Sequence, residues 1–253
     1  MRKRIDLKKV AIIIPMIFLL IQESASAQMS IPGISLDIGG TGNLEDTALS
    51  IRLLLLLTVL SVAPGLLLLM TSFTRIAIVL SFVRTAIGTQ TMPPAQVIMG
   101  LSMIFTFFIM GPTFQEMNKD ALQPFLAGEI AQEEAFDKAS GPIKVFMAKQ
   151  TRESDLKLFL DYREPVEING IKDIPLTALV PAFAISELKT AFQMGFLIFV
   201  PFIIIDMIVA SVLMAMGMMM VPPSLISLPF KILLFILVDG WHLVVKSLFV
   251  SFS

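Results

Sequence analysis

Four long stretches without a charged residue set the strongest limit on what this chain can fold into. They are residues 53–74, 85–115, 190–205 and 207–230, which hold 22, 31, 16 and 24 residues. A helix needs about 20 apolar residues to cross the hydrocarbon core of a bilayer. Three stretches are long enough alone, and the fourth is long enough if it tolerates Asp206. The sequence therefore predicts an all-α membrane protein.

Composition excludes several other classes of protein. Only 15% of the 253 residues are charged, against about a quarter in soluble domains, so a water-soluble enzyme is excluded. The net charge of −1 argues against a nucleic-acid partner, which would select a basic surface. Without cysteine, and with His242 as the single histidine, the chain lacks the usual ligands for a metal cluster. We expect no cofactor, no metal site and no catalytic residues.

Residues 1–27 have the three-part pattern of a secretory signal peptide. A basic start is followed by 12 apolar residues, 10–21, and by the small residues Ala25, Ser26 and Ala27. Twelve residues are too few to span a bilayer stably, so cleavage after Ala27 is favoured over an uncleaved anchor. Cleavage would place the mature N-terminus outside the cytoplasm.

The rest of the chain divides into two hydrophobic helical pairs around a polar insert. After a flexible periplasmic leader (28–47), we expect the first pair at 48–115, a mostly helical insert at 116–186, and the second pair at 187–253. The insert holds 12 acidic and 8 basic residues. The second pair carries a methionine-rich tip.

Prolines and glycines predict where the hydrophobic segments break. Pro64 and Gly65 predict a kink or break in the first segment, Gly111 and Pro112 the end of the second, and 221–223 the break between the third and fourth. Residues 73–94 would be a loop.

The orientation of the chain in the membrane follows from a mature N-terminus outside the cytoplasm. The 73–94 loop, with Arg75 and Arg84 and no acidic residue, would be cytoplasmic, as the positive-inside rule asks. The insert 116–186 would then be periplasmic.

Charges within the hydrophobic segments give the first functional signal. Asp206, Lys231 and Asp239 lie well inside them, and Glu187 lies at the entrance to the third segment. Such residues usually face a bundle interior or an aqueous path and pair there.

The partners of these charges can be judged from spacing. With a turn near 221–222, Asp206 precedes it by about 15 residues and Lys231 follows it by about 9, an axial offset of roughly 9 Å. A partner on another helix or subunit is therefore favoured over a pair inside one hairpin. We expect Glu187 and Lys231 to pair between neighbouring subunits.

Methionine gives the second signal. Five of the 17 methionines fall within residues 214–220, and methionine adapts its packing to varied neighbours. The cluster is either apolar filler of a membrane hairpin or a deformable collar, and composition favours filler.

Several long motifs resemble the FliP family of flagellar protein-export gate subunits. They are TSFTRIAIVLSFVR (71–84), GTQTMPPAQ (88–96), PAFAISELKTAFQMG (181–195), MMMVPP (218–223), LPFK (228–231) and DGW (239–241). The resemblance runs from about residue 48 to the C-terminus.

The resemblance implies a non-catalytic subunit of an oligomeric helical gate in the inner membrane, within the flagellar basal body. Its partners would be further copies of itself, FliQ-like and FliR-like small proteins, FlhA and FlhB. Unfolded flagellar proteins would pass through the gate. The family's methionine-rich loop implies a pore-lining role for Met218, Met219 and Met220.

Three alternatives stay open. The equivalent subunit of a virulence injectisome shares the motifs around Arg75, Glu187 and Lys231. An ion-coupled transporter would use Asp206, Lys231 and Asp239 as coupling groups, but we find no internal repeat typical of such folds. An intramembrane enzyme would need a nucleophile and base pair that the sequence does not offer.

Overall fold

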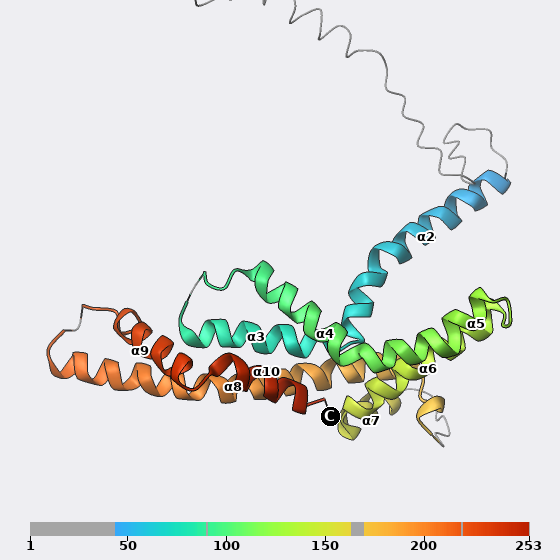
Figure 1. Ribbon diagram of the computed structural model, residues 1–253. Helices are drawn as coiled ribbons and strands as arrows, with labels where there is room; N and C mark the ends of the chain where they lie inside the picture. The colour runs from blue at the N-terminus through green and yellow to red at the C-terminus, as the bar shows by residue number, and fades with distance from the viewer. Residues whose placement is uncertain (1–43, 90, 163–169, 219, 253) are drawn as a thin grey trace, which may run out of the picture. The chain divides into compact units, whose positions relative to one another are not determined.

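The structure is a computed structural model that describes residues 44–252 apart from 90, 163–169 and 219. Every regular element in this part of the chain is a helix, which confirms the expected all-α class. The elements, labelled in Figure 1, are α2 (Leu44–Leu69), α3 (Phe73–Ile87), α4 (Ala95–Met117), the π-helix η1 (Asn118–Leu122), α5 (Gln123–Leu126), α6 (Gln132–Gln150), α7 (Glu153–Leu160), the 3₁₀-helix η2 (Ile171–Asp173), α8 (Leu176–Ala215), α9 (Pro223–Leu237) and α10 (Gly240–Val250).

The helix α3 forms the centre of the main core. Apolar side chains at helical spacing, Ile76, Val79, Leu80 and Val83, are fully buried. They cluster with residues of α4, α8, α9 and α10. The expectation that 73–94 is a loop is therefore wrong for 73–87. These residues repeat with the period that favours a helix with one buried face, and Gly88 ends it in the left-handed conformation (φ 85°).

The helices α3 and α8 run parallel and approach closely. Arg75 contacts Glu187 near one end, and seven residues further along α3 Phe82 lies against Gly195 of α8. A Cβ atom built on Gly195 would lie 2.5 Å from the Phe82 ring. Glycine is required here because any side chain would push the two helices apart.

The helix α8 is the longest element, with 40 residues, or about 60 Å at 1.5 Å per residue. It begins 11 residues before the position expected for the third hydrophobic segment. Its far end turns through residues 216–222 into α9, which packs back along it (Figure 1). The expected break at 221–223 is confirmed. The expected fourth segment is divided in two, because α9 and α10 meet at a bend of 62°.

Neither Pro64 nor Pro112 ends a described helix, so the expectation of a break at these two positions is wrong, while a kink at Pro64 stays a prediction. The helix α2 continues through Pro64, and α4 continues through Pro112 to Met117. Proline removes one helical hydrogen bond and disturbs the preceding turn, but in an apolar segment the remaining backbone groups have no better partner than the helix itself.

Part of the insert forms a second, smaller core on the first half of α8. Met147 of α6 and Ile174 pack against Leu179 and Phe183 of α8, and the ring of Phe146 lies edge-on to that of Phe183. The described insert is mostly helical. Its last part, from Leu176, belongs to α8.

Three described helices are long and apolar enough to cross a membrane, and the bent pair α9–α10 makes a fourth span if counted as one. Their outward surfaces are largely apolar, for example at Phe108, Leu197 and Ile236, which are each more than 60% exposed. Such surfaces suit lipid or another apolar protein surface.

Candidate functional site

A buried arginine uses its whole guanidinium group within one chain. Arg75 donates from Nε to Glu187 Oε2 (2.9 Å) and from Nη2 to the other carboxylate oxygen and to Gln150 Oε1 (3.1 Å). From Nη1 it donates to the carbonyl oxygen (2.8 Å) and the hydroxyl (2.9 Å) of Ser251. All five N–H groups of an arginine are thereby satisfied. The two side chains are 2% and 0% exposed. The free-energy cost of removing their charges from water is offset by this full set of hydrogen bonds.

This arginine joins four parts of the chain that are distant in sequence. Besides α3 and α8 it holds the end of α6, through Gln150, and the segment after α10, through Ser251. Its guanidinium also lies 3.9 Å from the centroid of the Phe252 ring, a favourable cation–π contact. Gln150 adds a bond from Nε2 to the Phe252 carbonyl (3.2 Å). Ser251 and Phe252 are therefore fixed beside the contact between α3 and α8.

A neighbouring polar cluster fastens the insert to α8. The hydroxyl of Ser186 donates to Asp155 Oδ2 (2.8 Å) and accepts the backbone N–H of Arg152 (3.1 Å). Arg152 also donates from Nη2 to Gln193 Oε1 (2.7 Å). Because Ser186 precedes Glu187, the two clusters fix one turn of α8 from both sides.

A second ion pair lies in the hairpin of α8 and α9. Lys231 Nζ is 2.5 Å from Asp206 Oδ2, and the buried hydroxyl of Ser227 donates to Asp206 Oδ1 (2.5 Å). A Cβ atom built on Gly88 would lie 3.7 Å from the same Nζ atom. The ammonium group therefore also lies beside the C-terminus of α3, where the helix dipole favours a cation.

The expectation that Asp206 and Lys231 lie at different heights is wrong. It assumed helices that continue to residue 221. Instead, α8 ends at Ala215, nine residues after Asp206, and α9 begins at Pro223, eight residues before Lys231. The loop between them takes up the difference, so the two side chains are level. The expected pairing of Glu187 with Lys231 is replaced by two pairs, each within one chain.

The third expected charge has a different setting. Asp239 lies at the bend between α9 and α10, with the left-handed φ of 49° that is uncommon for a residue other than glycine. Its side chain is exposed. Among the described residues it forms no ion pair with another side chain.

The methionine-rich tip lies where α8 ends. Gly217 adopts φ 74°, its N–H donates to the carbonyl of Met214 (3.0 Å), and the N–H of Met218 donates to that of Leu213 (3.0 Å). This pair of bonds is a Schellman motif, a common helix stop. Met218 is 41% exposed and Met220 is 96% exposed, whereas Met219 lies outside the described residues, as does Ala27.

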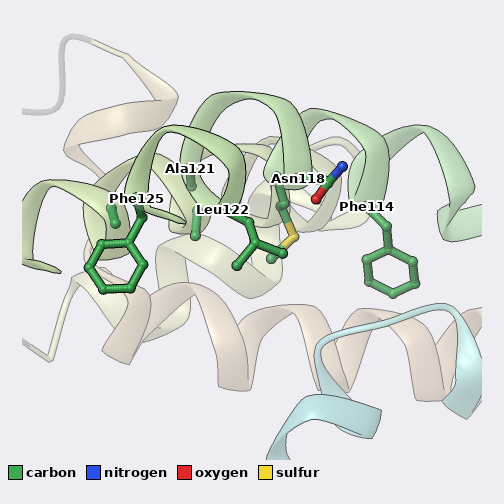
Figure 2. Close-up of a pocket in the computed structure, with 8 residues that line it drawn as sticks. Phe114, Asn118, Ala121, Leu122 and Phe125 are labelled. Carbon is green, nitrogen blue, oxygen red and sulfur yellow. The ribbon is translucent and has the colours of Figure 1, made fainter. Parts of the chain in front are cut away.

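The insert contains an apolar pocket of about 370 Å³. Figure 2 shows Phe114, Leu122 and Phe125 along it, with Asn118 as the polar side chain among those labelled. The side chains that line it are Phe114, Met117, Asn118, Ala121, Leu122, Phe125, Ala135 and Ala139. No ionisable group lies among them, so the pocket offers no acid, base or nucleophile.

Sequence reasoning identified the charged residues but missed the partner of Glu187. The sequence pattern predicts a loop around Arg75, yet Arg75 is the most extensively bonded side chain of the described core. Its place among Ile76, Val79 and Leu80 at helical spacing was a usable signal. Within the described chain no group of three or more histidine, cysteine, aspartate or glutamate side chains is arranged to hold a metal ion.

Comparison with known proteins places the chain in a family. The FliP family profile matches residues 56–248. The flagellar biosynthetic protein FliP of Bacillus subtilis is 63% identical over 217 residues, which cover 86% of this chain and 98% of that protein. The FliP proteins of Pectobacterium carotovorum and Aquifex aeolicus are 53% and 50% identical, over 82% and 88% of this chain and 81% and 92% of their own lengths. The chain belongs to the FliP family.

Proposed function

We propose that this protein is a pore-forming subunit of the flagellar type III export gate. Several copies would assemble with FliQ-like and FliR-like proteins in the inner membrane, near FlhA and FlhB, and pass unfolded flagellar proteins outward. The family match over residues 56–248 supports the flagellar role. The observation that carries the pore itself is the exposure of Met218 and Met220 at the end of the α8–α9 hairpin.

Two contacts support the hairpin beside its methionine-rich tip. The pair of Asp206 and Lys231 joins α8 to α9 about 13 Å from the end of α8, counted as nine residues. The Schellman stop at Gly217 fixes the start of the tip. A methionine side chain has three rotatable bonds and adapts to varied neighbours. Methionines on a fixed support could close a resting pore and then pack around any passing chain.

The arrangement of charges supports assembly through apolar surfaces. Glu187 and Lys231 are both satisfied within the chain, so the helices present mainly apolar side chains outward. At about 60 Å, α8 is twice the thickness of a bilayer core. Much of it would therefore be covered by neighbouring subunits and not by lipid.

The remaining parts of the proposal concern topology. The signal peptide would be removed after Ala27, and the insert 116–186 would lie in the periplasm. The compact packing of α6 and α7 on α8 through Phe183 and Ser186 supports an insert that folds as an extension of the hairpin.

The size of the extracted protein tests this function. The chain is extracted in mild detergent, alone and after co-expression with FliQ-like and FliR-like partners from the same source, and its mass is measured by size-exclusion with light scattering. A gate subunit gives one large complex that contains several copies. A species of one copy in both preparations would contradict the proposal and favour a transporter.

A further inference from the structure

Two opposite charges in apolar surroundings are left unpaired within the described part of one chain. Arg84 lies in the last turn of α3 and is partly exposed, and Asp239 is exposed at the α9–α10 bend. Neither side chain takes part in an ion pair with any described residue. The other two charges of the hairpin core are paired, so these two need a separate explanation.

Close packing of the neighbouring residues holds the backbone at Asp239. Gly240 is buried, and a Cβ atom built on it would lie 2.3 Å from the Phe235 ring. The ring of Trp241 packs edge-on against the same phenylalanine, with centroids 5.4 Å apart. This close packing supports the left-handed backbone at Asp239, since such a conformation persists only where its surroundings enforce it.

The side chains beside Asp239 are apolar and exposed. Ile236, Leu237 and Val238 are 68%, 73% and 46% exposed. A single carboxylate with an apolar margin resembles the centre of a protein interface, where a margin of apolar contacts excludes water from a polar contact. It suits a partner surface that is apolar and carries one cation.

Arg84 and Asp239 lie on the same side of the Asp206–Lys231 pair, away from the tip, and their heights along the hairpin differ by no more than about 6 Å. The level pair of Asp206 and Lys231 serves as the reference. Asp239 follows Lys231 by eight residues, or about 12 Å. Arg84 lies two residues beyond Phe82, which packs on Gly195. By this contact Arg84 is level with about residue 197 of α8, about 13 Å from the reference and away from the tip. By the contact of Gly88 with Lys231, Arg84 lies four residues, or about 6 Å, from the reference in the same direction.

We propose that Asp239 of one copy pairs with Arg84 of the next copy in the assembly. The inference rests on the proposed oligomeric gate. Copies related by rotation about an axis along the hairpin keep their heights, so residues on different faces but at one height can meet. Each charge also lies at the helix end that its sign favours. The helix dipoles account for the positions of the two charges, but not for the exposed apolar margin of Asp239.

Other exposed cations of the described helices fit less well. Lys189 of α8 is 17 residues from Asp206, about 26 Å, and therefore about 14 Å below Asp239. Lys246 lies on α10, seven residues after Asp239, so a contact between them in different copies would bring α10 of one copy against α10 of the next. A face that meets itself gives a two-fold contact and closes as a dimer, not as a multi-copy gate.

The absence of natural cysteines allows a direct test by cross-linking. Two differently tagged full-length chains are co-expressed with the partner proteins, one carrying Arg84→Cys and the other Asp239→Cys. Membranes are treated with a short bis-maleimide whose span matches an extended arginine–aspartate pair. We expect a tag-mixed dimer. The matched control combines Lys189→Cys with Asp239→Cys, and we expect no dimer from it because of the difference in height.

The outcomes separate this inference from the proposed function. A large complex without the Arg84–Asp239 dimer would overturn the pairing and leave the gate intact. A cross-link inside one chain carrying both cysteines, without a mixed dimer, would also overturn it. Equal cross-linking of the Lys189–Asp239 control would show that neighbouring copies have no fixed height relative to each other, and would contradict the pairing. Loss of the large complex in unsubstituted protein would contradict the proposed function itself.

Discussion

Arg75 and Glu187, 112 positions apart in the sequence, form a buried, two-pronged ion pair that aligns α3 with the first half of α8. The same guanidinium binds Ser251, so the segment after α10 is part of this cluster of contacts. A fork of two parallel N–H···O bonds fixes orientation as well as distance. We regard this pair as a structural support of the hairpin.

Replacement of Arg75 by lysine should therefore destabilise the protein although the charge is kept. An ammonium group cannot reproduce the planar fork that binds Glu187, Gln150 and Ser251 together. Removal of one partner of a buried ion pair costs about 3–5 kcal/mol, and Arg75→Ala should approach that range. The check is the thermal unfolding of the detergent-extracted chain. Arg152→Lys, at a more exposed site, is the control and should shift the midpoint less. Equal midpoints for wild type and Arg75→Ala would contradict the role of the pair.

The pair of Asp206 and Lys231 gives a prediction about the hairpin. Lys231→Ala or Asp206→Ala leaves a charge in an apolar setting, and either change should lower the amount of assembled complex. The exchange Asp206→Lys with Lys231→Asp should restore part of that loss, because the pair lies at one height. The yield of complex after detergent extraction measures both effects. No recovery in the exchanged variant, together with recovery in a Glu187–Lys231 exchange, would favour the intersubunit pair expected from the sequence.

Close packing at Gly195 predicts a strong effect from a single methyl group. Gly195→Ala places a Cβ atom 2.5 Å from Phe82, and overpacking of this kind costs about 1–3 kcal/mol. Gly111→Ala is the matched control, since Gly111 is also helical and a Cβ atom there meets nothing within 4 Å. That change should be neutral or stabilising, as alanine favours helix. The measurement is the thermal unfolding midpoint of each variant in detergent. Equal midpoints for the two variants would contradict the prediction, because they would show that α3 and α8 can move apart at little cost.

Processing of the N-terminus gives a prediction that needs no substitution. The intact mass of the membrane-extracted chain should correspond to residues 28–253, with Gln28 first. A chain that retains residues 1–27 would contradict cleavage after Ala27 and would remove the main support for a periplasmic insert.

The fold class could be predicted from the sequence because it depends on charge-free length, which requires no knowledge of contacts. The arrangement of α3 could not be predicted so easily. Its residues follow a span-length apolar stretch and precede Gly88, and hydropathy alone does not distinguish a loop with two arginines from a core helix that buries one of them. The apolar period of Ile76, Val79, Leu80 and Val83 held that information.

The charged residues of the candidate site were identifiable, but their partners were not. Spacing alone predicts different heights for Asp206 and Lys231, because the position where α8 ends depends on Gly217 and the bonds of the Schellman motif. Because α8 ends at Ala215 and α9 begins at Pro223, the axial offset between Asp206 and Lys231 is much smaller than expected. Partners such as Gln150 and Ser251 are distant in sequence and carry no local signal.

The central claim is that the methionine tip closes the resting gate. Met218, Met219 and Met220 are replaced together by alanine in the full-length chain, co-expressed with the partner proteins, and passive uptake of a small ion is measured across the membrane. Alanine removes most of the side-chain volume and all of its adaptable torsions. The control replaces Met99, Met103 and Met207, which are also exposed but lie away from the tip. We predict normal assembly with increased ion leakage for the tip variant alone. An assembled tip variant that leaks no more than wild type would contradict the claim.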